Sequence, residues 1–141
     1  MNFLPTIHGK TKVGFFFIAI LLLLLTSNAV AENTVDQLFQ RVQILLNMPQ
    51  PRLKIHIQIY QDQEELSEVY EMITGKPTKM PAFYLKKTNT IYLQKEKLST
   101  GILAHEMAHA IISHYPGVYP DREITESLCQ YIDKEISMRG F

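Results

Sequence analysis

Two histidines one helical turn apart, in an apolar segment, constrain this chain more than any other feature. Residues 98–114 show helical spacing of apolar side chains and contain His105 and His109 in the pattern H-E-x-x-H. Side chains at i and i+4 project from the same face of a helix, so both imidazoles can bind one ion. Glu106 lies beside that face, within reach of a bound water. The alternative, two ordinary helix histidines, leaves two imidazoles on a largely buried helix in need of partners.

A metal at this pair would need a further ligand from elsewhere in the chain. Hydrolytic zinc sites keep three protein ligands and one open position. The donors that follow His109 are His114, Asp121, Glu123, Glu126 and Asp133. His114 lies about 140° further round the same helix and points away. Asp121 is better placed to cap the last predicted helix.

Glu126 is the donor that the helical geometry favours. The apolar face predicted for the last helix consists of Ile124, Leu128, Tyr131, Ile132 and Ile136. Glu126 falls at the edge of this face, whereas Glu123 lies almost opposite, in the first turn, where the helix dipole explains an acid. We therefore expect His105, His109 and Glu126 to hold Zn²⁺, with Glu123 as the alternative. A solvated surface carboxylate is the other interpretation of Glu126.

The rest of the pattern predicts a small α+β domain. Residues 34–46 have helical periodicity, residues 54–60 alternate like a half-buried strand, and Asp62 with Glu65 forms a capping box for a helix that Gly75 ends. Residues 82–86 and 90–94 predict a hairpin. Asp121 caps a last helix to about Met138. The order α-β-α-β-β-α-α predicts a three-stranded, mainly antiparallel sheet with the histidine helix and a C-terminal glutamate helix.

The first 31 residues predict a secretory signal peptide. Residues 13–25 are apolar and uncharged, follow Lys10 and Lys12, and lead to the small residues Ala29 and Ala31. The apolar run is shorter than the roughly 20 residues that span a bilayer, so an uncleaved membrane anchor is the less favoured alternative. We expect residues 32–141 to form a single exported domain, periplasmic or secreted.

Charge and cysteine content exclude other classes of protein. The chain of 141 residues carries 14 Lys and Arg against 14 Asp and Glu, so it lacks the basic excess that nucleic-acid binding needs. Cys129 is its one cysteine, which excludes an intrachain disulfide framework. We interpret Cys129 as a small core residue, and a secondary hypothesis has its thiolate meeting the zinc and silencing it.

Residues 82–135 resemble the gluzincin zinc peptidases, and most of all the small minigluzincins and related peptidase MA-like proteins. Three segments carry the resemblance: the hairpin at residues 82–93, the helix at residues 102–109, and residues 125–129, which contain Glu126. The resemblance implies peptidase activity, with a peptide or protein substrate extended along an edge strand of the sheet. Residues 90–94 are the expected edge strand.

The chain departs from that family at two points. The family stabilises the developing oxyanion with a Tyr or His from a second lobe, for which this chain has no room; Tyr115, Tyr119 and Tyr131 are the residues available. Gln130 stands where an acid often follows the glutamate ligand, so no partner for a zinc-bound histidine is identified.

The sequence thus leads to three hypotheses. The first is an exported zinc-dependent peptidase in which Glu106 takes a proton from a zinc-bound water and passes it to the leaving amine. The second is a latent or non-catalytic zinc-binding module with a regulatory or binding role. The third is a protein whose zinc is purely structural, and the presence of Glu106 argues against it.

Overall fold

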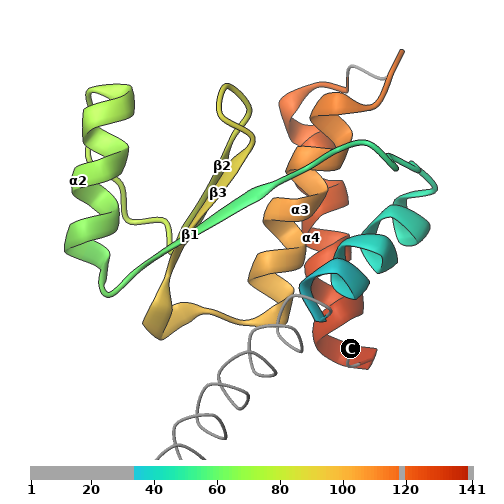
Figure 1. The fold of residues 1–141 in the computed structure, drawn as a ribbon, viewed down its shortest axis with the longest axis horizontal. Helices are drawn as coiled ribbons and strands as arrows, with labels where there is room; N and C mark the ends of the chain where they lie inside the picture. The colour runs from blue at the N-terminus through green and yellow to red at the C-terminus, as the bar shows by residue number, and fades with distance from the viewer. Residues whose placement is uncertain (1–33, 118–119, 140–141) are drawn as a thin grey trace, which may run out of the picture. The chain divides into compact units, whose positions relative to one another are not determined.

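The structure, a computed structural model, describes residues 34–117 and 120–139. Backbone contacts divide the chain into Met1–Asp36 and Gln37–Phe141, and the fold described here is that of the second unit. A helix covers residues 34–46, the range that periodicity predicts. It is followed by β1 (His56–Tyr60), α2 (Gln63–Thr74), β2 (Ala82–Leu85), β3 (Thr90–Gln94), the 3₁₀ turn η1 (Lys95–Lys97), α3 (Thr100–His114) and α4 (Arg122–Arg139) (Figure 1).

The α+β class is confirmed, with a sheet that is mixed. The strand order is β1-β3-β2. β2 and β3 form the predicted antiparallel hairpin, with Leu85 opposite Thr90. β1 pairs in parallel with β3, with His56 opposite Thr90. The chain returns from β1 through α2 before it enters the hairpin, and this crossover makes β1 parallel to β3.

The prediction that residues 90–94 form an edge strand is wrong. β3 lies at the centre of the sheet, and all five of its residues are buried. β1 adds to the side of β3 opposite β2, a long-range pairing that the sequence of the hairpin does not encode. The two edges are therefore β1 and β2, and β2 is the strand with more contacts to α3.

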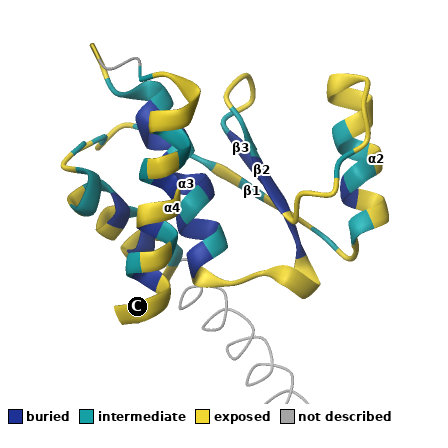
Figure 2. Ribbon diagram, turned by 180° about the vertical axis from the view of Figure 1, so that it is seen from behind, coloured by how far each residue is buried: buried dark blue, intermediate teal, exposed yellow. Residues whose placement is uncertain are grey.

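The sheet is covered by α2 on one side and by α3 on the other, with α4 packed against α3 (Figure 1). Leu66 of α2 packs with Phe83 and Tyr92 in one buried cluster, where the two rings stack with centroids 4.7 Å apart. α3 is buried on most of its circumference, as Figure 2 shows by colour. A helix buried on nearly all sides holds its side chains in fixed positions.

Local capping chemistry fixes the helix ends. The Asp62 carboxylate accepts hydrogen bonds from the backbone N–H groups of Glu64 and Glu65, and Gly75 ends α2 at φ 76°. Ser99 accepts from the N–H of Ile102 at the start of α3. Asp121 accepts from the N–H of Ile124 at the start of α4. These caps set where α3 and α4 begin.

The packing of α4 differs from the prediction. Ile124 and Tyr131 are 52% and 48% exposed, whereas the buried side chains of α4 are Cys129, Ile132 and Ile136. α4 packs on α3 more than on any other element, and this contact rotates its buried stripe toward Cys129. Glu126, one turn before Cys129, therefore lies at the border between α4 and α3.

The crossing of α3 and α4 depends on Gly101. A Cβ atom at this position would overlap the carboxylate of Asp133 and the hydroxyl of Ser137. Ser137 in turn donates a hydrogen bond to Asp133. The absence of a side chain at Gly101 lets the two helices approach closely at this end.

The N-terminal prediction falls outside the part of the chain that the structure describes. Residues 1–31, the predicted signal peptide, belong to the range that is not described. Within residues 34–117 and 120–139, no helix combines the length and the apolar character that a bilayer span requires.

Candidate metal centre

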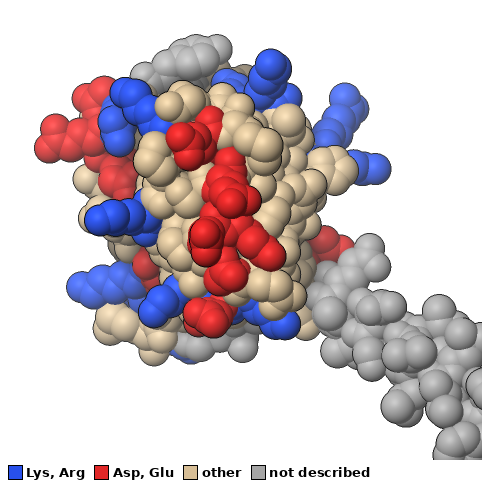
Figure 3. Space-filling view, turned by 90° about the vertical axis from the view of Figure 1, so that its left-hand side faces the viewer, with Lys and Arg blue, Asp and Glu red and all other residues tan. Residues whose placement is uncertain are grey.

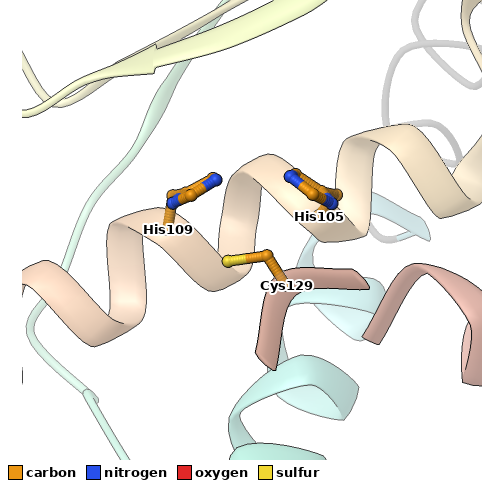
Figure 4. Close-up of side chains that lie close together, drawn as sticks. All are labelled: His105, His109 and Cys129. Atoms are coloured by element: carbon orange, nitrogen blue, oxygen red, sulfur yellow. The ribbon is translucent and has the colours of Figure 1, made fainter. Parts of the chain in front are cut away.

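α3 places both histidines on one side of the helix, as the spacing predicts. The rings of His105 and His109 have centroids 5.0 Å apart, and their side chains are 18% and 26% exposed. Both imidazoles are therefore partly withdrawn from solvent while one side of each stays accessible. Figure 4 shows the two rings side by side along α3.

The Glu126 carboxylate of α4 faces both rings. Its Oε1 atom lies 3.4 Å from Nε2 of His105, and its Oε2 atom lies 3.4 Å from Nε2 of His109. Glu123, the alternative donor, is exposed at the start of the same helix. The structure thus brings together the three residues that the sequence analysis selected as ligands, and it leaves Glu123 in solvent.

The other candidate donors are engaged elsewhere. His114 Nδ1 lies 3.0 Å from the carbonyl oxygen of Ala110 and 3.4 Å from the hydroxyl of Tyr84. Asp121 caps α4, and Asp133 accepts a hydrogen bond from Ser137.

Cys129 belongs to the same cluster. Its sulfur and one nitrogen of each imidazole all lie within 4.8 Å of one another, so His105, His109 and Cys129 form a possible metal-binding group. In Figure 4 the cysteine reaches from α4 toward the two rings of α3. From the sequence, this position was interpreted as a small core residue, with zinc binding by its thiolate as a secondary hypothesis.

Glu106 is buried beside the cluster, with 7% of its surface exposed. The backbone N–H of Tyr84 in β2 donates a hydrogen bond to its carboxylate. Burial, and then the nearby negative charge of Glu126, raise the pKa of Glu106 from 4.5 to about 8. A carboxyl group with a pKa in this range is suited to accept and release a proton near neutral pH.

The donors favour a cation at this place. Burial and the neighbouring His105 lower the pKa of His109 below its usual 6.5, which favours the neutral imidazole that binds metals. Burial and the carboxylates of Glu126 and Glu106 raise the pKa of the Cys129 thiol. One carboxylate, a thiol and two imidazoles in a partly buried space match the oxygen, sulfur and nitrogen donors that bind zinc.

The candidate ligands His105, His109 and Glu126 open into a cleft of about 600 Å³. Its lining includes His105, Glu106, His109 and Glu126, strand β2 and the end of α2. The apolar part of the lining includes Tyr70, Ile73 and Met80, and Lys86 and Arg122 bring positive charge.

Of the three tyrosines considered as oxyanion stabilisers, the two that the structure describes do not line the cleft. Tyr131 is 48% exposed on α4, and neither it nor Tyr115 lines the cleft. Tyr119 lies outside the described residues. Tyr70 and Tyr84, which the sequence analysis did not consider for this role, do line it.

Acidic side chains outside the cleft gather on α2. Glu64, Glu65, Glu68 and Glu71 are exposed, and the view in Figure 3 shows acidic groups in a stripe over this side of the molecule. Their exposure agrees with a solvated helix face.

No protein-family profile matches this chain, and no curated protein matches it in sequence.

Proposed function

We propose that the chain is a zinc-dependent metallopeptidase of the gluzincin kind. The observation that carries the proposal is the position of Glu126, whose two oxygens each lie 3.4 Å from one imidazole of the i, i+4 pair. Two imidazoles and a carboxylate from a neighbouring helix are a ligand set of hydrolytic zinc sites. The buried carboxylate of Glu106 next to this set supports a catalytic role over a purely structural one.

In this proposal His105, His109 and Glu126 hold the ion. When bound, Zn²⁺ supplies Lewis-acid chemistry, because it acidifies a coordinated water and polarises a carbonyl. Glu106 accepts a proton from the attacking water and transfers it to the departing amine. The Tyr84 N–H holds the Glu106 carboxylate at the cleft while it does so.

β2 is the strand along which a peptide substrate would bind. It is an edge of the sheet and lines the cleft with the metal-binding side chains, whereas residues 90–94 lie one strand further in. An extended peptide would add to this edge through backbone hydrogen bonds. Tyr70, Ile73 and Met80 at the α2 end of the cleft would favour an apolar substrate side chain.

The place of action in this proposal follows from the N-terminal segment. Cleavage of residues 1–31 would release the domain into the periplasm or the medium. The domain would contact a membrane only if residues 1–31 stayed attached.

A latent or non-catalytic zinc-binding module is the second candidate. The observation that favours it is Cys129, whose sulfur lies within 4.8 Å of the candidate imidazole donors. A thiolate on the ion would compete with the position that hydrolysis keeps open.

Incubation with a mixed peptide library, with and without a chelator, tests the proposal. Cleavage that the chelator abolishes and added Zn²⁺ restores supports the peptidase. Stoichiometric zinc without cleavage favours the latent or non-catalytic module. Absence of zinc binding contradicts both.

A further inference from the structure

We propose that Cys129 is a fourth protein ligand of the ion and closes the coordination sphere in the resting protein. The inference rests on the proposed function and adds a regulatory feature to it. His105, His109 and Glu126 would keep their roles, and the thiolate would take the position that a substrate carbonyl needs.

The geometry of α4 carries this inference. Cys129 follows Glu126 by three residues, so both side chains lie on the same face of the helix. Its side chain is fully buried, and its sulfur approaches one nitrogen of each imidazole within 4.8 Å. Within the described residues, the structure shows no hydrogen bond to this sulfur. The sulfur therefore lies close to the imidazole nitrogens and has no other polar partner among these residues (Figure 4).

The distances fit ligation after a small adjustment. Zinc bonds of about 2.0 Å to nitrogen and 2.3 Å to sulfur place neighbouring donors of a tetrahedral site roughly 3.5 Å apart. The observed separations, which reach up to 4.8 Å, would shorten as the side chains close on the ion.

The chemistry of the ligand set predicts the consequence. A bound zinc ion deprotonates a coordinating thiol, and four protein ligands make a closed site of the structural type. A peptide carbonyl can reach such an ion only after one ligand leaves. In this proposal Cys129 is the ligand that leaves, and His105, His109 and Glu126 remain as the three protein ligands of a hydrolytic site.

Cobalt substitution tests the inference directly. Co²⁺ replaces zinc and gives an intense near-ultraviolet charge-transfer band only when a thiolate is bound. Because Cys129 is the one cysteine of the chain, the band can be assigned without ambiguity. We expect it in the Co²⁺-loaded wild-type protein and in Glu123→Gln, the control on the exposed side of α4. Cys129→Ala and Cys129→Ser should lose the band while keeping the visible bands of bound cobalt.

Two results would overturn the inference. A wild-type protein that binds Co²⁺ with visible bands but no sulfur band lacks the thiolate ligand, and the proposed zinc peptidase is then unaffected. A wild-type protein that binds no Co²⁺ contradicts both proposals.

In support, we expect Cys129→Ser to bind zinc at least about tenfold more weakly, and Cys129→Ala to cleave peptides faster than wild type.

X-ray absorption at the zinc edge keeps the test independent of the variants. Should both Cys129 variants fail to fold, the zinc-loaded wild-type protein alone decides the question. A sulfur scatterer at about 2.3 Å supports the inference. A shell of nitrogen and oxygen alone overturns it.

Discussion

The backbone N–H of Tyr84 donates a hydrogen bond to the carboxylate of Glu106, and so joins the edge strand β2 to the histidine-bearing helix α3. The same strand lines the cleft that contains the candidate ligands. A peptide that added to β2 would therefore lie next to the group proposed to handle the proton. β2 would then both align the substrate and hold the Glu106 carboxylate, which would fix the position of the substrate relative to the proton-accepting group.

Glu106→Gln should retain zinc and lose turnover. The amide keeps the shape of the side chain but cannot accept a proton, and general-base catalysis contributes roughly 10²–10⁴-fold. Zinc content by elemental analysis and cleavage of a library-derived peptide check the two parts. Glu123→Gln serves as the matched exposed control. A Glu106→Gln protein with full activity would exclude the proposed role.

Removal of the Glu126 carboxylate should weaken metal binding. Glu126→Ala leaves two imidazoles with no carboxylate between them, whereas Glu123→Ala changes an exposed residue in the first turn of α4. Metal content of the two variants after dialysis, measured beside wild type, is the comparison. Equal zinc in both variants would show that position 126 is not a ligand.

The metal-free protein should lose stability as the pH rises from about 4.5 to about 8. In the folded chain the pKa of Glu106 is raised to about 8 by burial and by Glu126, whereas in the unfolded chain the carboxyl loses its proton near 4.5. Between these values the folded state binds more protons, so the free energy of unfolding falls with increasing pH. The maximum effect is on the order of several kcal/mol.

Denaturant unfolding across this pH range, with chelator present, measures the effect. Glu106→Gln should flatten the dependence, because the amide does not titrate. A wild-type slope unchanged by Glu106→Gln would assign the pH dependence to other groups.

Gly101→Ala should destabilise the packing of α3 against α4. The added methyl group overlaps Asp133 and Ser137, and overpacking of this kind costs about 1–3 kcal/mol. Denaturant unfolding measures the loss. Ser137→Ala removes one of the two overlapping atoms, so the cost of Gly101→Ala should be smaller in that background. An equal cost in both backgrounds would contradict this explanation.

Several features of the chain were predictable because they depend on residues close in sequence. Asp62, Ser99 and Asp121 cap their helices, and Gly75 ends α2, through contacts within a few residues. The side-by-side position of His105 and His109 follows from the pitch of one helix. The helical periodicity of α4 placed Glu126 at the border of its buried face. This held even though Ile124 and Tyr131, which were assigned to that face, are about half exposed.

The sequence alone therefore determined the helices, the hairpin and the paired imidazoles, since each arises from local hydrogen bonding and periodicity. Tertiary structure decided which strand is an edge, because β1 joins β3 only after a crossover through α2. It also decided the rotation of α4, which brings Glu126 and Cys129 together to the histidines. Both depend on the packing of surfaces far apart in the chain, where the burial of whole faces outweighs the preference of any single residue.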